Sequence, residues 1–330
     1  MRRLTVRSEH WPLHEPFIIS RLDPFVDAAV VVVEIEEDGL IGRGECEHTD
    51  LYEADYPAIL PQLEAVRDAI EAGADRLALQ QLLPPGCACS ALDCALWDLE
   101  AKRSGVPVWQ CLGLTQPPAP LTTAFTLSLR SPQEMGEAAG RAAARPLLKL
   151  KLGQPQGDLE RVAAVRTAAP RARLIVDANT GWQRQQLIDY LPRLKALGVE
   201  LIEQPFAVGC EAWLDGIDRL VPIAADESCL SRESLPALIG RFDLVNIKLD
   251  KSGGLTEAWA LAQAAREQGF DIMVGCNIGT SLAMAPAVLL AQGARVVDLD
   301  GPLLLKTDHA QGLQYQGSTL YPPQAALWGG

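Results

Sequence analysis

The sequence predicts an α/β protein in which a small α+β domain is followed by a parallel barrel of eight strands. Three observations predict this class. Strand-like and then helical segments fill the first third of the chain, a proline-rich segment follows them, and beyond it eight short apolar runs alternate with longer helical stretches. Strands that alternate with helices at this period favour a parallel sheet, and eight such units favour a closed barrel.

The first domain, predicted over residues 1–117, begins with antiparallel strands. Residues 29–36 are apolar and mostly β-branched, and the chain returns over residues 40–45. Between them, Asp38-Gly39 is a pair typical of a tight hairpin turn. We therefore expect a sheet with at least one hairpin at the start of the chain.

Helices follow in the same domain. Apolar residues recur at three- and four-residue spacing over residues 57–70 and again over 90–104. For the second helix we expect Ser90 as the N-cap and Gly105 as the end. Residues 115–120 contain three prolines and form a stiff, polar connector, so the domain boundary is placed there.

The barrel is predicted over residues 118–302. Its candidate strands recur at the spacing of one strand plus one returning helix. Little chain follows the eighth strand before Gly301-Pro302, so we expect the last helix to be missing and residues 303–330 to return to the first domain. The candidate strands are residues 121–129, 147–152, 173–178, 200–204, 222–227, 244–249, 271–276 and 294–299.

The composition excludes several classes of protein. The 330 residues carry 29 basic and 42 acidic side chains, a formal charge of −13, whereas a nucleic-acid-binding protein needs a basic face to meet phosphates. No apolar run approaches the roughly 20 residues that span a bilayer, and residues 1–7 lack the apolar segment of a signal peptide. The eight cysteines form no CxxC pair and are expected to be buried, reduced thiols. We therefore expect a cytoplasmic protein without nucleic-acid or membrane partners.

Charged residues fall at the ends of six of the eight candidate strands. In a parallel barrel the active site lies at the C-terminal ends of the strands. A charged side chain at the end of an apolar strand is costly unless it is paired, solvated or bound to an ion. Six such placements are hard to attribute to chance, so we expect them to form the functional site. They are Lys149 and Lys151, Asp177, Glu203, Asp226, Lys248, and Asp298 with Asp300.

Asp177, Glu203 and Asp226 would form a cluster of three carboxylates at neighbouring strand ends. Three close negative charges repel one another unless a cation neutralises them. Hard oxygen ligands without a nearby histidine or cysteine suit Mg²⁺. The alternative is a set of rim salt bridges with the lysines of the same strand ends.

The lysines weigh against simple salt bridges. Lys149 and Lys151 are two residues apart on a strand, so both point to the same face. Close ammonium groups beside a bound dication lower each other's pKa, so that a lysine can act as a base near neutral pH. Lys248 lies on the sixth strand, across the barrel mouth from the second, and its neighbours in the strand place it on the inward face. Two lysines that face each other across a metal-bound substrate can remove a proton from one side and return one to the other.

Three further charged residues have two interpretations. Lys251 follows in a loop before glycines, and we interpret it as structural or solvated. Asp298 and Asp300 share one face of the eighth strand, where they could hold a substrate ammonium group or cap a loop before Gly301-Pro302.

These positions together make the sequence resemble the enolase superfamily, and within its muconate-lactonizing-enzyme subgroup the dipeptide epimerases of the L-Ala-D/L-Glu epimerase type. The likeness covers almost the whole chain. The element Asp298-Leu299-Asp300-Gly301-Pro302 separates the dipeptide epimerases from other members of the subgroup. The other matching segments are residues 11–14, 44–46 and 91–102 in the first domain and 245–258 in the barrel.

The resemblance implies a (β/α)7β modified TIM barrel with an N-terminal α+β capping domain, in agreement with the missing last helix. It implies one Mg²⁺ per subunit, held by Asp177, Glu203 and Asp226. It makes Lys151 and Lys248 the acid/base catalysts. The implied substrate-binding residues are Lys149 beside the substrate carboxylate, Asp298 and Asp300 on its α-ammonium group, and Thr126 and Cys276 in the pocket.

The reaction that the resemblance implies is inversion of the α carbon of the C-terminal residue of an L,L or L,D dipeptide by 1,1-proton transfer. The α proton beside a carboxylate is a very weak acid because its removal leaves a dianionic ene-diolate, which a divalent cation and Lys149 would stabilise. The alternatives on the same scaffold are N-succinylamino acid racemisation, o-succinylbenzoate synthesis and muconate cycloisomerisation. A binding protein without activity is disfavoured by the complete set of lysines and carboxylates, and a homo-oligomer is left open.

One loop departs from the family pattern. Ala-Glu epimerases carry an arginine after the first cap strand that binds the glutamate side chain, whereas Pro24 stands at that place here and Arg21 is a candidate to replace it. The acidic residues of the covering segments are either solvated charges of an acidic protein or a negative lid that favours a cationic or hydrophobic second residue. They are Asp23, Asp27, Glu47, Asp50, Glu53 and Asp55.

Overall fold

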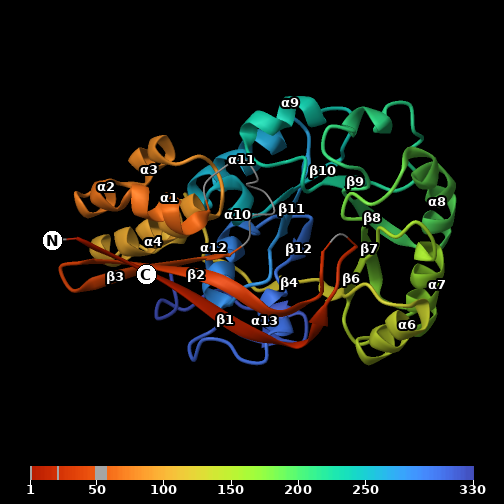
Figure 1. The fold of residues 1–330 in the computed structure, drawn as a ribbon, viewed down its shortest axis with the longest axis horizontal. Helices are drawn as coiled ribbons and strands as arrows, with labels where there is room; N and C mark the ends of the chain where they lie inside the picture. The colour runs from red at the N-terminus through yellow and green to blue at the C-terminus, as the bar shows by residue number, and fades with distance from the viewer. Residues whose placement is uncertain (1, 21, 49–57) are drawn as a thin grey trace.

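The structure of the protein is a computed structural model that describes residues 2–20, 22–48 and 58–330. Its first part contains a curved antiparallel sheet with helices packed against it (Figure 1). The predicted hairpin is confirmed: Asp38 and Gly39 join the second strand to the third, and both have the positive φ, 53° and 81°, that a two-residue turn of this kind requires. The strands, in sheet order, are β1 (Arg3–Phe17), β2 (Phe25–Glu37) and β3 (Leu40–Glu47).

The helix predicted over residues 57–70 is described from residue 58 onward and consists of two helices that meet at Val66. The interruption is a single residue, and it leaves Leu63 and Ile70 buried as the helical pattern predicts. The helices of this first part are α1 (Ile59–Ala65), α2 (Arg67–Glu71), α3 (Arg76–Leu82), α4 (Cys87–Ser104) and α5 (Val108–Cys111).

The start of α4 differs from the prediction, whereas its end agrees. The N-cap is Gly86 rather than Ser90, which is buried inside the helix. Two prolines precede Gly86 and hold the chain out of helical conformation, and Gly86 has a φ of 150°, which glycine adopts at little cost, so the helix begins directly after it. Gly105 ends the helix in the left-handed conformation, with a φ of 67°.

The second part of the chain forms an eight-stranded parallel sheet in which sequential strands are neighbours throughout. The backbone N–H of Ala124 donates to the carbonyl of Val297 at 2.8 Å, so the first and last strands meet and the sheet closes into a barrel. The predicted (β/α)7β barrel with an N-terminal capping domain is confirmed. The barrel strands are β5 (Phe125–Leu127), β6 (Leu147–Lys151), β7 (Arg173–Asp177), β8 (Val199–Glu203), β9 (Ile223–Ala225), β10 (Leu244–Ile247), β11 (Asp271–Gly275) and β12 (Val296–Asp298).

The first predicted barrel strand, residues 121–129, is in fact two strands, and only β5 belongs to the barrel. The N–H of Thr123 donates to the carbonyl of Ser318, whereas the next N–H, of Ala124, donates to the last barrel strand. The chain therefore passes from one sheet to another at this point. The small second sheet consists of β4 (Leu121–Thr122), β14 (Thr319–Leu320) and β13 (Tyr315–Gln316).

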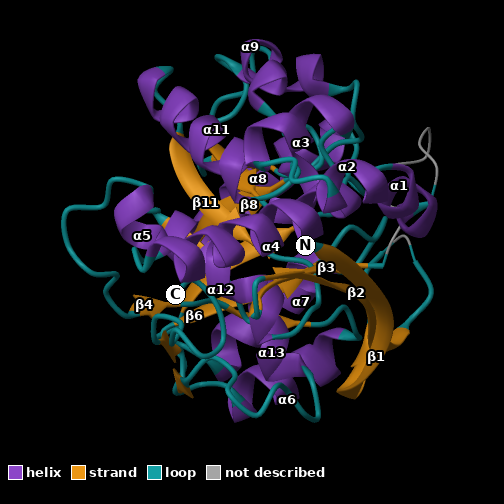
Figure 2. Ribbon diagram, turned by 90° about the vertical axis from the view of Figure 1, so that its left-hand side faces the viewer, coloured by secondary structure: helices purple, strands orange, loops and turns teal. Residues whose placement is uncertain are grey.

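Helices surround the barrel, and α10, α11 and α12 lie between its strands and the capping domain (Figure 1). Figure 2 looks onto the capping domain and shows both termini on this face. The eighth unit ends in a single four-residue turn, so the last full helix is missing, as predicted. The helices are α6 (Pro132–Arg141), α7 (Asp158–Ala168), α8 (Arg184–Ala196), α9 (Leu235–Leu238), α10 (Leu249–Ser252), α11 (Leu255–Glu267), α12 (Ser281–Leu290) and α13 (Gly301–Leu304), with short 3₁₀ turns η1 (Glu211–Leu214) and η2 (Arg232–Ser234).

The inward-facing side chains of the barrel form two layers. The apolar layer has one buried residue from each of seven strands and Ala124, which directly precedes β5. Its members are Ala124, Leu147, Ile175, Leu201, Ala224, Leu244, Met273 and Val296. Side chains alternate along a strand, so the residues two positions further along face inward again. These form the polar layer: Thr126, Lys149, Asp177, Glu203, Asp226, Asn246, Gly275 and Asp298. The strands therefore place chemistry at their C-terminal ends directly above an apolar floor.

The C-terminal segment contacts both parts of the molecule. Lys306 donates its backbone N–H to Pro12 at 2.8 Å, and β14 pairs with β4 beside the barrel. Near the end of the chain, Arg43 donates to the carbonyl of Ala326 at 2.7 Å, and the N–H of Gly329 donates to Asp98 Oδ1 at 2.8 Å. The segment thus fastens the barrel to the capping domain.

The cysteines agree only in part with the expectation of buried thiols. Cys111 is exposed, and Cys210 and Cys276 are partly buried, whereas the other five are buried. Across residues 2–20, 22–48 and 58–330, no helix is both long and apolar enough to cross a bilayer.

Candidate active site

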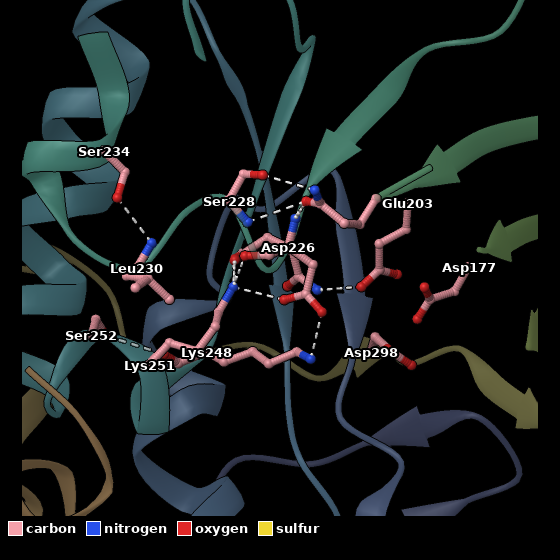
Figure 3. A network of polar contacts seen from close by, with 12 residues as sticks. Asp177, Glu203, Asp226, Ser228, Leu230, Ser234, Lys248, Lys251, Ser252 and Asp298 are labelled. Atoms are coloured by element: carbon pink, nitrogen blue, oxygen red, sulfur yellow. Dashed lines mark hydrogen bonds and ion pairs between the residues drawn. The ribbon is translucent and has the colours of Figure 1, made fainter. Parts of the chain in front are cut away.

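The three carboxylates predicted to bind a metal lie at the ends of three adjacent strands. Asp177 and Glu203 are the last residues of β7 and β8, and Asp226 directly follows β9. All three are at most 1% exposed (Figure 3). Burial raises the pKa of Glu203, and the negative charge of Asp177 adds to this, so that it reaches about 7. Burial and the charge of Asp177 therefore outweigh the nearby lysines, which lower the pKa of this carboxyl.

Lys149 lies among these carboxylates. Its ammonium group is 2.7 Å from Asp298 Oδ2, 2.7 Å from Glu203 Oε2 and 3.4 Å from Asp177 Oδ2. Burial lowers the pKa of Lys149, but the surrounding carboxylates outweigh burial and raise it well above its ordinary value. The surrounding carboxylates set this direction, and the lowered pKa expected for a lysine beside a bound dication stays a prediction.

The two predicted catalysts are each held by a different carboxylate. Lys151 donates to Asp177 Oδ2 at 2.6 Å. Lys248 donates to Asp226 Oδ2 at 2.8 Å (Figure 3). Lys151 ends β6, and Lys248 directly follows β10; four steps of the eight-stranded order separate these strands. The two lysines therefore come from opposite sides of the barrel.

Lys251 has a structural role, which is one of the two interpretations that the sequence allowed for it. It is 2% exposed and donates to Asp226 Oδ1 at 2.7 Å, to the carbonyl of Asp226 and to the carbonyl of Asn246. Lys251 and Lys248 thus hold the two oxygens of one carboxylate, and burial of Asp226 is outweighed by them, so its pKa is strongly lowered.

The donor set suits a hard cation. As they stand, no three carboxylate, imidazole or thiol groups of the described chain lie close enough together to enclose an ion. An ammonium group, that of Lys149, lies instead among Asp177, Glu203 and Asp298. The carboxylates available are buried and offer only oxygen donors, which is the chemistry that Mg²⁺ fits. Metal binding by Asp177, Glu203 and Asp226 stays a prediction.

Three polar residues that position this site were given no role by the sequence. Asn246 donates to Glu203 Oε1 at 2.8 Å, and Gln204 Oε1 accepts from the N–H of Asp226 at 2.9 Å. Asp158 accepts from the N–H groups of Gly153 and Gln154 after β6. Asn246 could have been found, since it shares the inward face with Lys248 by strand alternation. Gln204 acts across to the end of the next strand and Asp158 within the loop after its own strand, and strand alternation predicts neither contact.

A cavity of about 410 Å³ lies above the polar layer, a volume within the range of small-molecule sites. Each lysine and substrate-binding residue implied by the resemblance lines it: Thr126, Lys149, Lys151, Lys248, Cys276, Asp298 and Asp300. The three predicted metal ligands lie beneath this lining. The capping domain closes the cavity with Phe17, Ile19, Phe25 and Glu47.

The residues expected around the substrate amino group lie together. Asp300 Oδ2 accepts from the N–H of Thr126 at 2.6 Å, while Asp298 Oδ2 accepts from Lys149. Burial and the neighbouring charge of Asp298 raise the pKa of Asp300 to about 7. Burial also raises the pKa of the Cys276 thiol, so it lines the cavity as a neutral group. Two buried carboxylates with one bound lysine leave negative charge that an ammonium group would neutralise.

The acidic lid residues fall into three groups. Asp23 is exposed, and Asp27 lies 3.3 Å from His10, so both agree with surface charges. Glu47 instead lines the cavity, and burial followed by the charge of Asp250 raises its pKa to about 8. Interpretation as a solvated charge is therefore wrong for Glu47, because β3 carries it over the barrel mouth. Arg21, Asp50, Glu53 and Asp55 lie outside the described residues.

A capped parallel barrel with opposed lysines above buried carboxylates defines a class of acid/base enzymes. The comparisons with known proteins specify the family. Residues 1–113 match the mandelate racemase / muconate lactonizing enzyme N-terminal domain, and residues 134–324 match the enolase C-terminal domain-like family. The chain belongs to the mandelate racemase / muconate lactonizing enzyme family of the enolase superfamily.

Its relatives are epimerases and racemases. The chain is 43% identical to an L-Ala-D/L-Glu epimerase of Escherichia coli K12, over 97% of this chain and 100% of that one. It is 48% identical to an N-acetyl-D-glutamate racemase of a Pseudoalteromonas species, over 75% of this chain and 78% of that one. The isomerase class expected from the sequence is confirmed by these relatives.

Two solved structures are similar over nearly their full length. One is an enolase family member from Agrobacterium tumefaciens with homology to dipeptide epimerases, which holds sodium and L-Ala-L-Glu; it has 46% identity and a TM-score of 0.96, with 100% of both chains covered. The other is a dipeptide epimerase from Methylococcus capsulatus with Mg and L-Arg-D-Lys; it has 31% identity and a TM-score of 0.88, with 97% of this chain and 96% of that one covered.

Proposed function

We propose that the protein is a Mg²⁺-dependent dipeptide epimerase that inverts the α carbon of the C-terminal residue of its substrate. The observation that carries this proposal is the position of Lys151 and Lys248: both line one cavity, and they come from opposite sides of the barrel. A racemising enzyme needs a base on one side of the substrate carbon and an acid on the other. The relatives, which are epimerases of dipeptides and racemases, support the same reaction.

Each lysine has a carboxylate that fixes its orientation. Asp177 holds Lys151, and Asp226 holds Lys248, so neither ammonium group must be ordered when the substrate binds. In one direction Lys151, as the neutral amine, takes the α proton, and the protonated Lys248 delivers another to the opposite face; in the other direction the roles and the protonation states exchange. Asp177, Glu203 and Asp226 would hold Mg²⁺, which when bound supplies positive charge for the substrate carboxylate as the α proton leaves.

The ends of the dipeptide would be held at different parts of the cavity. Lys149 is placed to contact the substrate carboxylate, and Asp298 with Asp300 to accept the α-ammonium group. Thr126 supports Asp300 through its backbone N–H, and Cys276 contributes a small neutral surface. A buried pair of carboxylates favours a free amino terminus, because a neutral acyl group would leave their charge without compensation.

The cavity wall favours a hydrophobic or cationic second residue. Among the described residues that line it, the cations are the three lysines already assigned, whereas Glu47 and Glu227 are acidic. Phe17, Phe25 and Ile278 add apolar surface. A glutamate side chain would meet this wall without a cation of its own, because the three lysines already pair with carboxylates, and this lowers its affinity relative to a neutral or basic side chain.

N-acylamino acid racemisation is the second candidate. It is favoured by the 48% identity to the N-acetyl-D-glutamate racemase, over 75% of this chain. The two candidates differ in the group that faces Asp298 and Asp300, an ammonium in one and an amide in the other. That difference makes them separable by substrate alone.

A panel assay in deuterated buffer with Mg²⁺ tests both candidates. L-Ala dipeptides with leucine, phenylalanine, lysine, arginine or glutamate as the second residue are compared with N-acetyl- and N-succinylamino acids, and epimerised product is read by mass and chiral separation. Dipeptide turnover with glutamate below the apolar and basic members is expected. L-Ala-L-Glu as the best substrate would refute the second-residue preference, and turnover of N-acyl amino acids alone would refute the dipeptide reaction.

A further inference from the structure

One wall of the cavity leads directly into a barrel helix. Cys276, Asn277 and Ile278 line the cavity between the end of β11 and the start of α12. Thr280 is the N-cap of α12, and its hydroxyl accepts from the N–H of Leu282 at 3.1 Å. The position of this wall is therefore set by two points, the end of the strand and the first turn of the helix.

The start of the helix is held from outside the barrel at two points: by Glu45 of the capping domain at Thr280, and by Asp308 of the C-terminal segment, which accepts from the N–H and the hydroxyl of Ser281. Glu45, on β3, accepts from the N–H of Thr280 at 2.7 Å through Oε1, and from the hydroxyl of Thr280 through Oε2. Glu45 is 2% exposed and Thr280 is fully buried. A helix N-terminus has unsatisfied N–H groups and a partial positive charge, so a buried carboxylate is well placed there.

Little space separates Glu45 from the wall. A Cβ atom added to Gly279 would lie 3.1 Å from Glu45 Oε1, and one added to Gly301 would lie 3.2 Å from the backbone nitrogen of Gly279. Gly301 directly follows Asp300, which is predicted to bind the substrate amino group. A movement of the wall would therefore disturb both sides of the substrate site.

The capping domain makes a second contact of the same kind, which offers a matched control. Asp93, on α4, accepts from the N–H of Thr256 at 2.9 Å and from its hydroxyl at 2.6 Å, at the start of α11. Among the described residues that line the cavity, none comes from residues 253–256. The Asp93 contact joins the same two domains but ends away from the substrate.

We propose that Glu45 is a positioning residue for substrate binding: across the boundary between the capping domain and the barrel, it fixes the cavity wall formed by Cys276, Asn277 and Ile278. The inference rests on the proposed function, because it concerns the affinity of the dipeptide site. Lys151 and Lys248 stand at the ends of other strands, so loss of the Glu45 contact affects the fit of the substrate more than the proton transfers.

The test compares Glu45→Gln with Asp93→Asn. Each substitution removes a charge and keeps the size of the side chain. We expect Glu45→Gln to raise KM about tenfold with kcat within about twofold, whereas Asp93→Asn leaves both within about twofold although it lowers Tm. Hydrogen–deuterium exchange should become faster at residues 277–283 in Glu45→Gln and at 254–258 in Asp93→Asn. Thr280→Val, which removes only the hydroxyl, should change KM in the same direction by less.

An unchanged KM in Glu45→Gln, or equal KM changes in both variants, would overturn the proposal in favour of general stabilisation of the domain contact. Should Glu45→Gln fail to fold, Thr280→Val decides the question by the same comparison. If the wild-type protein epimerised no dipeptide, the proposed function would fail, yet the exchange measurement would still show whether Glu45 fixes the wall. Unchanged exchange at residues 277–283 would overturn the proposal on its own.

Discussion

The apolar and polar layers of the barrel are made by the same eight strands, two residues apart, and they have opposite chemistry. In the apolar layer every residue is buried and none is charged. In the polar layer five of the eight residues are charged, and they too are at most 3% exposed. Burial is therefore the same in both layers, but only one of them must be satisfied by specific partners.

This difference separates stability from chemistry. The apolar layer gains free energy simply by excluding water, and its residues need only fill space. The polar layer loses hydration and recovers it through pairs such as Lys149 with Glu203 and Lys248 with Asp226. The charges of the polar layer serve to act on a substrate. The free energy that the apolar layer below them contributes offsets the cost of burying those charges.

The largest expected effect is on activity, from removal of either lysine. Lys151→Ala and Lys248→Ala should each lower kcat for epimerisation by about 10³-fold or more, because general acid/base groups of this kind contribute up to 10⁴. The apolar layer is untouched, so circular dichroism and Tm should show a folded protein. Exchange of the α proton with deuterated solvent on one face should survive in one of the variants. Normal epimerisation by Lys248→Ala would show that the two-base assignment is wrong.

Removal of metal should affect the activity, which depends on the polar layer, and leave the fold unchanged. Treatment with a chelator should abolish epimerisation, and added Mg²⁺ should restore it, because the charge that develops on the substrate carboxylate then lacks its counter-ion. The secondary structure should not change, since the lysines already pair with the carboxylates. Full activity in the presence of chelator would contradict the metal prediction, with a parallel titration of Mg²⁺ as the control.

The apolar layer can be weakened without change of the site. Leu244→Ala removes a fully buried side chain from β10, directly below Asn246, and should lower the free energy of unfolding by about 2–5 kcal/mol, as large-to-small core substitutions do. Leu244→Met nearly conserves volume and is the matched control, with a cost below about 1.5 kcal/mol. Urea denaturation measures both. If Leu244→Ala lost activity while remaining as stable as the control, the division between the layers would be wrong.

The smallest effect is expected outside both layers, at His309. The contact with Glu45, partly opposed by burial, raises the pKa of His309. A raised histidine pKa stabilises the fold fully below the unfolded-state pKa, and the stabilisation is lost as pH rises through the folded-state pKa. The free energy of unfolding of the wild type should therefore exceed that of His309→Asn by more at pH 6 than at pH 9. This change between the two pH values should be below about 1 kcal/mol because the ring is partly exposed. A larger stability difference at pH 9 than at pH 6 would contradict the raised pKa of His309.

Much of the site could be predicted because it depends on strand alternation and strand order. Those two rules place Lys149, Asp177 and Glu203 on one inward-facing ring, and they set Lys151 opposite Lys248. Prediction failed where partners come from distant parts of the chain. The first barrel strand divides because β14 pairs with its beginning, and Glu47 lines the cavity because β3 crosses the barrel mouth.

The sequence by itself determined the periodic part of this protein. Apolar runs with a charged end, repeated at the interval of a strand and a helix, specify a barrel and the end at which its chemistry lies, because backbone geometry converts spacing into direction. Only the tertiary structure decided which carboxylate holds which lysine, and that Glu45 meets the start of α12 235 residues later in the chain. Such pairs depend on distances between elements that are far apart in sequence, and no local pattern encodes those distances.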